Sequence, residues 1–193
     1  MTADERALFD ASLVDSAALH ERARQNPQPV LDAAAAIVDA FRRGGMLLLF
    51  GNGGSASDAQ HVSAELVGRF QRERAGLPAI ALTTDTSILT SVANDDGFDR
   101  VFVRQIEALG RAGDVALGIS TSGGSPNVLA ALEAARARGL KTIALTGRDG
   151  GAVGRAAAIH VNVPAQSTAR VQEVHRTLLH IICDIVEREL VDR

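Results

Sequence analysis

The sequence predicts an α/β protein, a three-layer αβα sandwich built around a five-stranded parallel sheet. Short apolar runs alternate with helical stretches along the chain, which is the pattern of a parallel sheet with crossover helices. Each run is apolar throughout rather than at every second residue, as in strands that are buried on both faces. Because crossovers between parallel strands are right-handed, successive helices come to cover both faces of the sheet.

The length and composition narrow the class of protein. The 193 residues are expected to form a single domain, with N-terminal helices over about 5–42 and an α/β core over about 46–193. The net charge of −3 gives no broad basic field, and aromatic residues make up only 3% of the chain. We therefore expect no nucleic-acid partner. Cys183 is the single cysteine, which excludes an internal disulfide and favours a small core residue.

The sequence also bears on location. The first ten residues, MTADERALFD, are acidic where a signal peptide is basic and then apolar. No apolar run approaches the roughly 20 residues that span a bilayer. We expect a cytoplasmic protein with no membrane partner.

Two helices are expected before the first strand, over residues 5–25 and 30–42, with a break at the prolines Pro27 and Pro29. The first has an apolar side that includes Leu8 and Leu13. Two leading helices are more than a small sheet needs. They either cover the sheet or pack against a partner chain, and the sequence leaves both open.

The core elements follow in regular alternation. Strands are expected at 46–50, 77–82, 115–119, 141–145 and 158–163. Helices are expected from Ser55, in the turn that ends near 94–97, and at 98–109, 128–138 and 168–190. In such sheets, ligands bind beyond the carboxyl ends of the strands. The loops after the first and third strands lie there, and both are rich in glycine and serine.

The first of these loops reads Gly51-Asn52-Gly53-Gly54-Ser55. Glycine permits a positive φ and a close approach of a ligand to the backbone. Serine is a favoured N-cap, so Ser55 predicts the start of a helix, whose free N–H groups attract phosphate. The loop lacks the GxGxxG and GK[ST] patterns, which excludes the dinucleotide-binding and P-loop readings.

The second loop carries four hydroxyls in six residues, at Ser120, Thr121, Ser122 and Ser125. Pro126 in the first helical turn, with Ser125 as the cap, marks another helix start. An ordinary capped turn needs one or two hydroxyls. Four of them, with free N–H groups, favour a neutral phosphate-binding nest.

Two helical rows carry possible metal ligands. His61 and Glu65 are four residues apart on one helix face, which suits a metal site but also an ordinary exposed pair. Gln172, Arg176 and His180 form a second row on the last helix. Gln172 and His180 are about 12 Å apart along a straight helix. For both to bind one ion, their side chains must reach over Arg176, the helix must bend, or different protomers must supply them.

Four segments together resemble the phosphoheptose isomerase family of the sugar isomerase (SIS) superfamily. They are GNGGSASDAQHVSAEL, SVANDDGFDRVFVRQIEALG, GISTSGGSPNVL and VQEVHRTLLHIICDIVE. The resemblance covers nearly the whole chain. It implies a SIS, flavodoxin-like fold and a homotetramer with sites at subunit contacts. It also implies conversion of D-sedoheptulose 7-phosphate to D-glycero-D-manno-heptose 7-phosphate through an enediol, for the heptose of lipopolysaccharide or capsule.

The resemblance also implies roles for individual residues. Glu65 and His180 would be the acid–base pair, and one zinc ion per subunit would be held by His61, Glu65, Gln172 and His180. Substrate contacts would come from both loops and from four further positions. They are Asn52, Gly53, Gly54, Glu65, Asn94, Asp95 and Gln172, with Ser120, Thr121, Ser122 and Ser125 on the phosphate.

Two other readings remain open. One is a non-catalytic SIS protein of the DnaA initiator-associating type, a tetrameric binding partner with the same fold and length. The complete set His61, Glu65, Gln172 and His180 argues against it, because a binding module does not need these residues. The other is a SIS isomerase of a different sugar phosphate, which the spacing of the motifs does not exclude.

Overall fold

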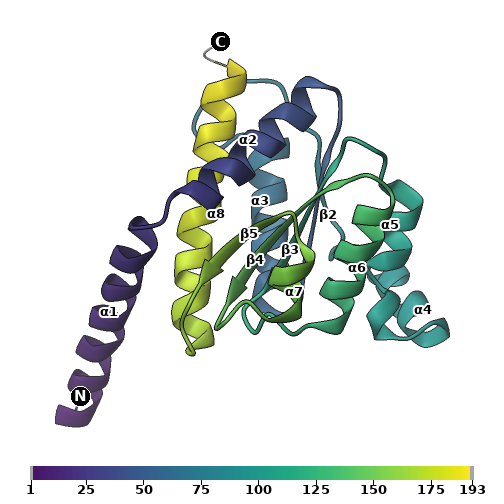
Figure 1. Ribbon diagram of the computed structural model, residues 1–193. Helices are drawn as coiled ribbons and strands as arrows, with labels where there is room; N and C mark the ends of the chain where they lie inside the picture. Colours follow the sequence, from purple (N-terminus) through teal and green to yellow (C-terminus); the bar gives the residue numbers. More distant parts are fainter. Residues whose placement is uncertain (1, 192–193) are drawn as a thin grey trace.

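Five parallel strands form the centre of the molecule in the order β2-β1-β3-β4-β5 (Figure 1). The computed structural model describes residues 2–191. The strands are β1 (Leu47–Gly51), β2 (Ala79–Ala81), β3 (Val115–Ser120), β4 (Lys141–Gly147) and β5 (Ile159–Val163). Each predicted strand is present, which confirms the predicted α/β class and the five-stranded parallel sheet.

Helices cover both faces of the sheet (Figure 1). They are α1 (Ala3–Arg24), α2 (Gln28–Arg42), α3 (Gly54–Val67), α4 (Thr86–Asp95), the 3-10 turn η1 (Phe98–Arg100), α5 (Val103–Leu109), α6 (Pro126–Ala137), α7 (Gly151–Ala156) and α8 (Thr168–Val191). Successive residues of β1 point to opposite faces. Leu47 and Leu49 therefore join the core beneath α2, α3 and α8, whereas Leu48 and Phe50 join the core beneath α5, α6 and α7.

The strand order reverses between β1 and β3. The chain leaves β1 towards β2 on one side, and leaves β3 towards β4 on the other. Gly51 at the end of β1 pairs with Ile119 near the end of β3. The loops that follow these two strands are therefore neighbours at a topological switch point, where doubly wound sheets bind ligands.

The two N-terminal helices have different surroundings. On α2, Val30, Ala34 and Ile37 are buried against the sheet, so this helix covers the core. On α1, Leu8 is 70% exposed and Val14 is 66% exposed. Figure 1 shows α1 extending away from the sandwich beside α8. The prediction that the N-terminal helices cover the sheet is therefore confirmed for α2. Leu8 and Val14 of α1, in contrast, are exposed to solvent in the single chain.

Two predictions about the number and extent of the helices were wrong. A continuous helix over 98–109 is broken into η1 and α5. Val101, Phe102 and Val103 are all buried there, and three consecutive side chains on a regular helix point in three directions. Helix α7 was missed, because its sequence GAVGRA contains two glycines and reads as a loop.

Within residues 2–191, no helix combines the length and the apolar character needed to cross a membrane.

Candidate active site

Helices α3 and α8 lie side by side and bring the two predicted rows of polar residues together. Gly54, at the start of α3, packs so closely against the amide of Gln172 that a Cβ there would collide with it. One turn further on, Arg176 Nε donates to Asp58 Oδ1 at 2.8 Å. Because the contacts follow one another in the same order along both helices, α3 and α8 run in parallel.

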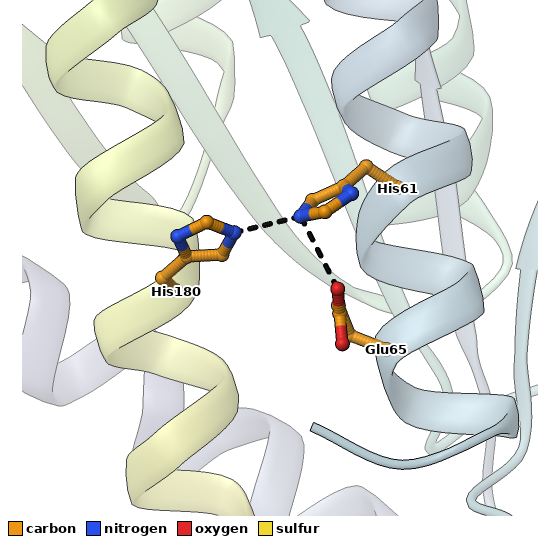
Figure 2. Close-up of side chains that lie close together, drawn as sticks. All are labelled: His61, Glu65 and His180. Atoms are coloured by element: carbon orange, nitrogen blue, oxygen red, sulfur yellow. Dashed lines mark hydrogen bonds and ion pairs between the residues drawn. The ribbon is translucent and has the colours of Figure 1, made fainter. Parts of the chain in front are cut away.

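His61, Glu65 and His180 form the next contact of this series (Figure 2). The Nε2 atoms of His61 and His180 are 2.7 Å apart, and His61 Nε2 is 3.4 Å from Glu65 Oε1. One ligand atom from each residue lies within 4.8 Å of the others. All three side chains are half-buried. Two imidazole nitrogens and a carboxylate oxygen are a donor set that zinc accepts.

The surroundings keep His61 neutral. Burial, and secondarily the positive charge of Arg176, lower the pKa of His61 below its ordinary value of 6.5, although Glu65 opposes this shift. A neutral imidazole keeps a lone pair on one ring nitrogen. That lone pair is what a metal ion or a proton in transfer requires, so the residues present fit a divalent metal.

The second serine-rich loop gathers its hydroxyls at the end of β3. Ser120 Oγ lies 2.8 Å from Ser125 Oγ and 3.3 Å from Ser122 Oγ, and the Gly124 N–H donates to Ser122 Oγ at 3.2 Å. Ser125 is the N-cap residue of α6, with Pro126 in the first turn, as predicted. Its hydroxyl bonds to Ser120 rather than to a backbone N–H of α6.

The first glycine-rich loop starts its helix earlier than predicted. Gly53, with φ +56°, is the N-cap residue and α3 begins at Gly54, so the prediction of Ser55 as the cap was wrong. The positive φ of Gly53 turns the chain into the helix two residues sooner. Ser55 is instead buried in the first turn, where a Cβ on Gly51 would lie 2.9 Å from the Ser55 Cβ.

Asn127 is a residue that sequence reasoning missed. Its side-chain amide exchanges two hydrogen bonds with that of Asn52, at 2.8 and 2.9 Å, and Asn127 is buried. This reciprocal pair joins the loop after β1 to the first turn of α6. In the sequence, Asn127 is indistinguishable from an ordinary residue of a helix start.

Other predicted site residues lie apart from the cluster. Asn94 and Asp95 are exposed at the end of α4, where Asn94 Nδ2 donates to Asp95 Oδ1 at 2.8 Å. Gln172 lies against Gly54. Gly54 and Glu65 are eleven residues apart on α3, or about 16 Å along the axis. Within one chain, the loop residues therefore lie at one end of α3 and the His–Glu cluster lies near the other end. The substrate contacts, and Gln172 as a metal ligand, stay predictions.

Comparisons with known proteins place this geometry in a family. Residues 14–147 match the family model of the SIS domain. A protein of Geobacter sp. strain M21 named phosphoheptose isomerase is 60% identical over 163 residues, which are 84% of this chain and 85% of the relative.

Solved structures agree with this relationship. A phosphoheptose isomerase from Neisseria gonorrhoeae superposes with a TM-score of 0.89 at 45% identity, over 96% of this chain and 99% of that one. One from Francisella tularensis gives a TM-score of 0.92 at 38% identity, over 97% and 100%. The chain therefore belongs to the SIS domain family and, within it, to the phosphoheptose isomerase family.

Proposed function

We propose that this protein is an aldose–ketose isomerase that interconverts D-sedoheptulose 7-phosphate and D-glycero-D-manno-heptose 7-phosphate. The observation that carries the proposal is the cluster in which the Glu65 carboxylate and the His180 imidazole lie within 4.8 Å of each other on either side of His61, from helices far apart in the sequence. An enediol mechanism needs one group that exchanges carbon-bound protons and one that exchanges oxygen-bound protons. The family relationship supplies the seven-carbon substrate.

The proposed reaction assigns one role to each of the two groups. Glu65 removes the C1 proton of the ketose and returns a proton at C2. His180 moves the hydroxyl proton, so that the O1 hydroxyl becomes the carbonyl and the O2 carbonyl becomes a hydroxyl. The product has the same atoms and electrons as the substrate. The two residues could also exchange these roles.

A bound zinc ion would be held by His61, Glu65 and His180, with Gln172 as the predicted fourth ligand. The ion would polarise the substrate oxygens and stabilise negative charge on the enediolate. The close approach of three suitable ligand atoms supports a divalent metal, and the donor set fits zinc in particular.

The phosphate would bind at the loop after β3. The hydroxyls of Ser120, Ser122 and Ser125 converge there, and α6 begins immediately behind them. Hydroxyl donors and the positive end of a helix suit a phosphate without any lysine or arginine. Asn52, Gly53 and Gly54 would contact the sugar from the neighbouring loop.

We further propose that the chain is a single SIS domain that assembles into a homotetramer in the cytoplasm. The exposed apolar side of α1 supports assembly, as does the separation of the loops from the His–Glu cluster within one chain. Contacts between subunits would bring the two halves of the site together. The product would serve as a precursor of activated heptose for lipopolysaccharide or capsule.

The deciding experiment is an assay of aldose formation from sedoheptulose 7-phosphate, with and without a chelator. Wild type and Glu133→Gln, whose side chain is exposed on α6, should turn over the substrate. Glu65→Gln and His180→Gln should be inactive while keeping the wild-type circular dichroism spectrum and melting behaviour. A folded wild-type protein that is inert with added zinc would favour the non-catalytic SIS reading. Turnover of another sugar phosphate but not of sedoheptulose 7-phosphate would favour a SIS isomerase of a different substrate.

A further inference from the structure

The loop between α3 and β2 reaches back to the catalytic cluster. The Phe70 ring packs against the His180 ring, with centroids 5.5 Å apart and planes inclined by 32°. The His61 ring packs against the same imidazole at 4.9 Å. His180 is therefore bounded by a predicted ligand and by a phenyl ring to which no role has been given.

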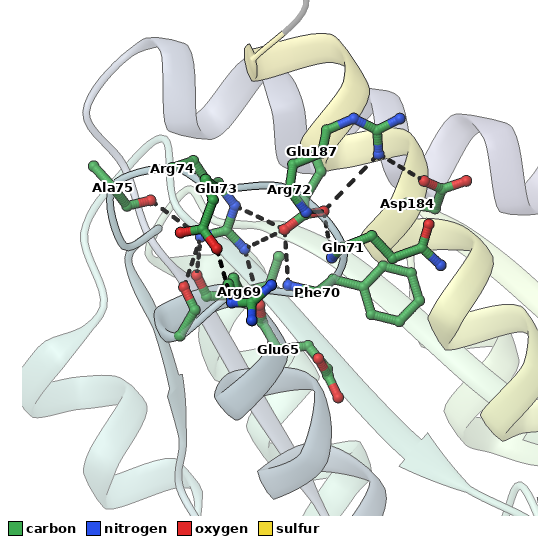
Figure 3. Close-up of polar contacts among 12 residues, drawn as sticks. Glu65, Arg69, Phe70, Gln71, Arg72, Glu73, Arg74, Ala75, Asp184 and Glu187 are labelled. Carbon is green, nitrogen blue, oxygen red and sulfur yellow. Dashed lines mark hydrogen bonds and ion pairs between the residues drawn. The ribbon is translucent and has the colours of Figure 1, made fainter.

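The Glu187 side chain holds this loop by binding the loop's backbone N–H groups (Figure 3). The buried carboxylate accepts N–H bonds from Phe70 at 2.8 Å, Gln71 at 2.9 Å and Arg72 at 3.1 Å. Glu187 follows His180 by seven residues, about two turns of α8, so both lie on one side of that helix. The helix that carries the imidazole thus also carries the anchor for the ring that packs on it.

Arg74 links the same anchor to α3. Its guanidinium lies 2.9 Å from Glu187 Oε1, and the Arg74 side chain is only 5% exposed. It also donates to the carbonyl oxygens of Glu65 and Leu66, both at 2.8 Å, in the last turns of α3. One buried ion pair therefore fixes the backbone of Glu65, the position of Phe70 and the C-terminal part of α8 relative to one another.

We propose that Phe70 is a positioning residue for His180, an inference that rests on the proposed isomerase function. The ring, held by Glu187 and Arg74, restricts the imidazole to one orientation towards Glu65 and keeps water from one of its faces. Proton transfer depends on such alignment. Phe70 need not touch the substrate to have this effect.

An ordinary packing role makes a different prediction. If Phe70 only fills space, leucine should replace it without loss of turnover. If its flat ring orients the imidazole, an aromatic residue is required. The variants Phe70→Tyr, Phe70→Leu and Phe70→Ala separate the two roles. Gln71→Ala is the matched control, because Gln71 is exposed and bonds Glu187 through its backbone alone.

The first measurement is steady-state kinetics on the zinc-loaded protein. Phe70→Ala and Phe70→Leu should lower kcat by about 10-fold to 100-fold with little change in KM. Phe70→Tyr should restore most of kcat, and Gln71→Ala should match wild type. Unchanged kcat in Phe70→Ala overturns the inference. So does a loss in Phe70→Tyr as large as that in Phe70→Ala.

The second measurement does not depend on activity. In proton NMR spectra, the ring of Phe70 should shift the signals of the His180 carbon-bound protons, which are identified by their loss in His180→Gln. Phe70→Ala should move these signals and Phe70→Tyr should keep them. If the wild type is inactive but the His180 signals change in this way, the proposed function is contradicted and the contact between Phe70 and His180 is supported. If the wild type is active and Phe70→Ala has the same kcat and the same His180 signals, the positioning role of Phe70 is contradicted and the proposed function stands.

Discussion

His175 is a fully buried histidine outside the cluster of His61, Glu65 and His180. Its Nε2–H donates to the Thr146 carbonyl at 2.9 Å, which ties α8 to β4. Its Nδ1 is buried with no hydrogen-bond partner. Protonation would place a charge and an unsatisfied donor in the core, so the fold requires the neutral form.

This residue predicts acid sensitivity. Burial lowers the pKa of His175 below 6.5, so the unfolded chain binds the proton more readily than the fold does. Its contribution to stability is complete above about pH 6.5 and is lost as pH falls below that value towards the folded pKa. Burial shifts the pKa of His160 in the same direction.

The expected loss is at most about 1.4 kcal/mol per pH unit for His175. Guanidinium unfolding at pH 7.5 and 5.5 measures it, and His175→Gln, which retains an N–H donor, should show a smaller loss. An undiminished loss in His175→Gln would contradict the assignment.

Cys183 should be chemically inert in the folded protein. Burial, reinforced by the charges of Glu65 and Glu187, raises the pKa of its thiol from 9.0 to about 12. Since the thiolate is the reactive form, a disulfide reagent at pH 8 should label the unfolded chain and spare the native one. Rapid labelling without unfolding would show that the thiol is accessible.

At the scale of elements, the chain between α3 and β2 has no helix or strand of its own, yet it is firmly held. Glu187 accepts three backbone N–H bonds, and Arg74 donates to carbonyl oxygens at the end of α3. Burial alone would raise the pKa of Glu187, but the N–H donors and Arg74 outweigh it and lower that pKa. The carboxylate is therefore charged in the fold, and its stabilising effect fades only as pH falls below about 4.5.

Glu187→Gln should lower the free energy of unfolding by about 3 kcal/mol or more, because Arg74 would remain buried without its partner charge. Asp10→Asn removes an exposed ion pair with Arg6 on α1 and should cost less than about 1 kcal/mol. Chemical denaturation of both variants at pH 7 gives the comparison. Equal losses would mean that the buried pair contributes little.

The helices and strands were largely predictable from sequence, because continuous apolar runs and capping residues report local structure directly. The details that failed depend on contacts between distant residues or on backbone conformations that the residue types do not fix. The break between η1 and α5 follows from burial of Val101 and Phe102, and the early start of α3 follows from the positive φ of Gly53. The pairing of Asn52 with Asn127 needs the sheet order, which brings two distant loops together. Glu187 carried no signal in the sequence beyond that of a charged residue on a long helix.

At the scale of the whole molecule, the two candidate half-sites of one chain are separated by much of the length of α3. Four apolar residues of α1, Leu8, Phe9, Leu13 and Val14, are each at least 56% exposed. Both features favour a site that is complete only in an assembly.

Phe9→Glu combined with Leu13→Glu should therefore prevent the proposed assembly and lower turnover by at least tenfold, because charges on an apolar contact oppose burial. Light scattering after size exclusion measures the mass, and the assay is run at the same concentration. Asp10→Asn is a control on the same helix. A monomer that retained normal metal affinity and activity would refute the shared site.

The parallel course of α3 and α8 limits how the gene can change. Four successive contacts join the helices, at Gly54, Asp58 and His61 and then in the loop at Phe70. Inserting or deleting one codon in either helix would rotate everything beyond it by about 100°. The later partners would then face elsewhere, although no side chain had been altered. Insertions and deletions within α3 and α8 should therefore abolish function even at positions where single substitutions are tolerated.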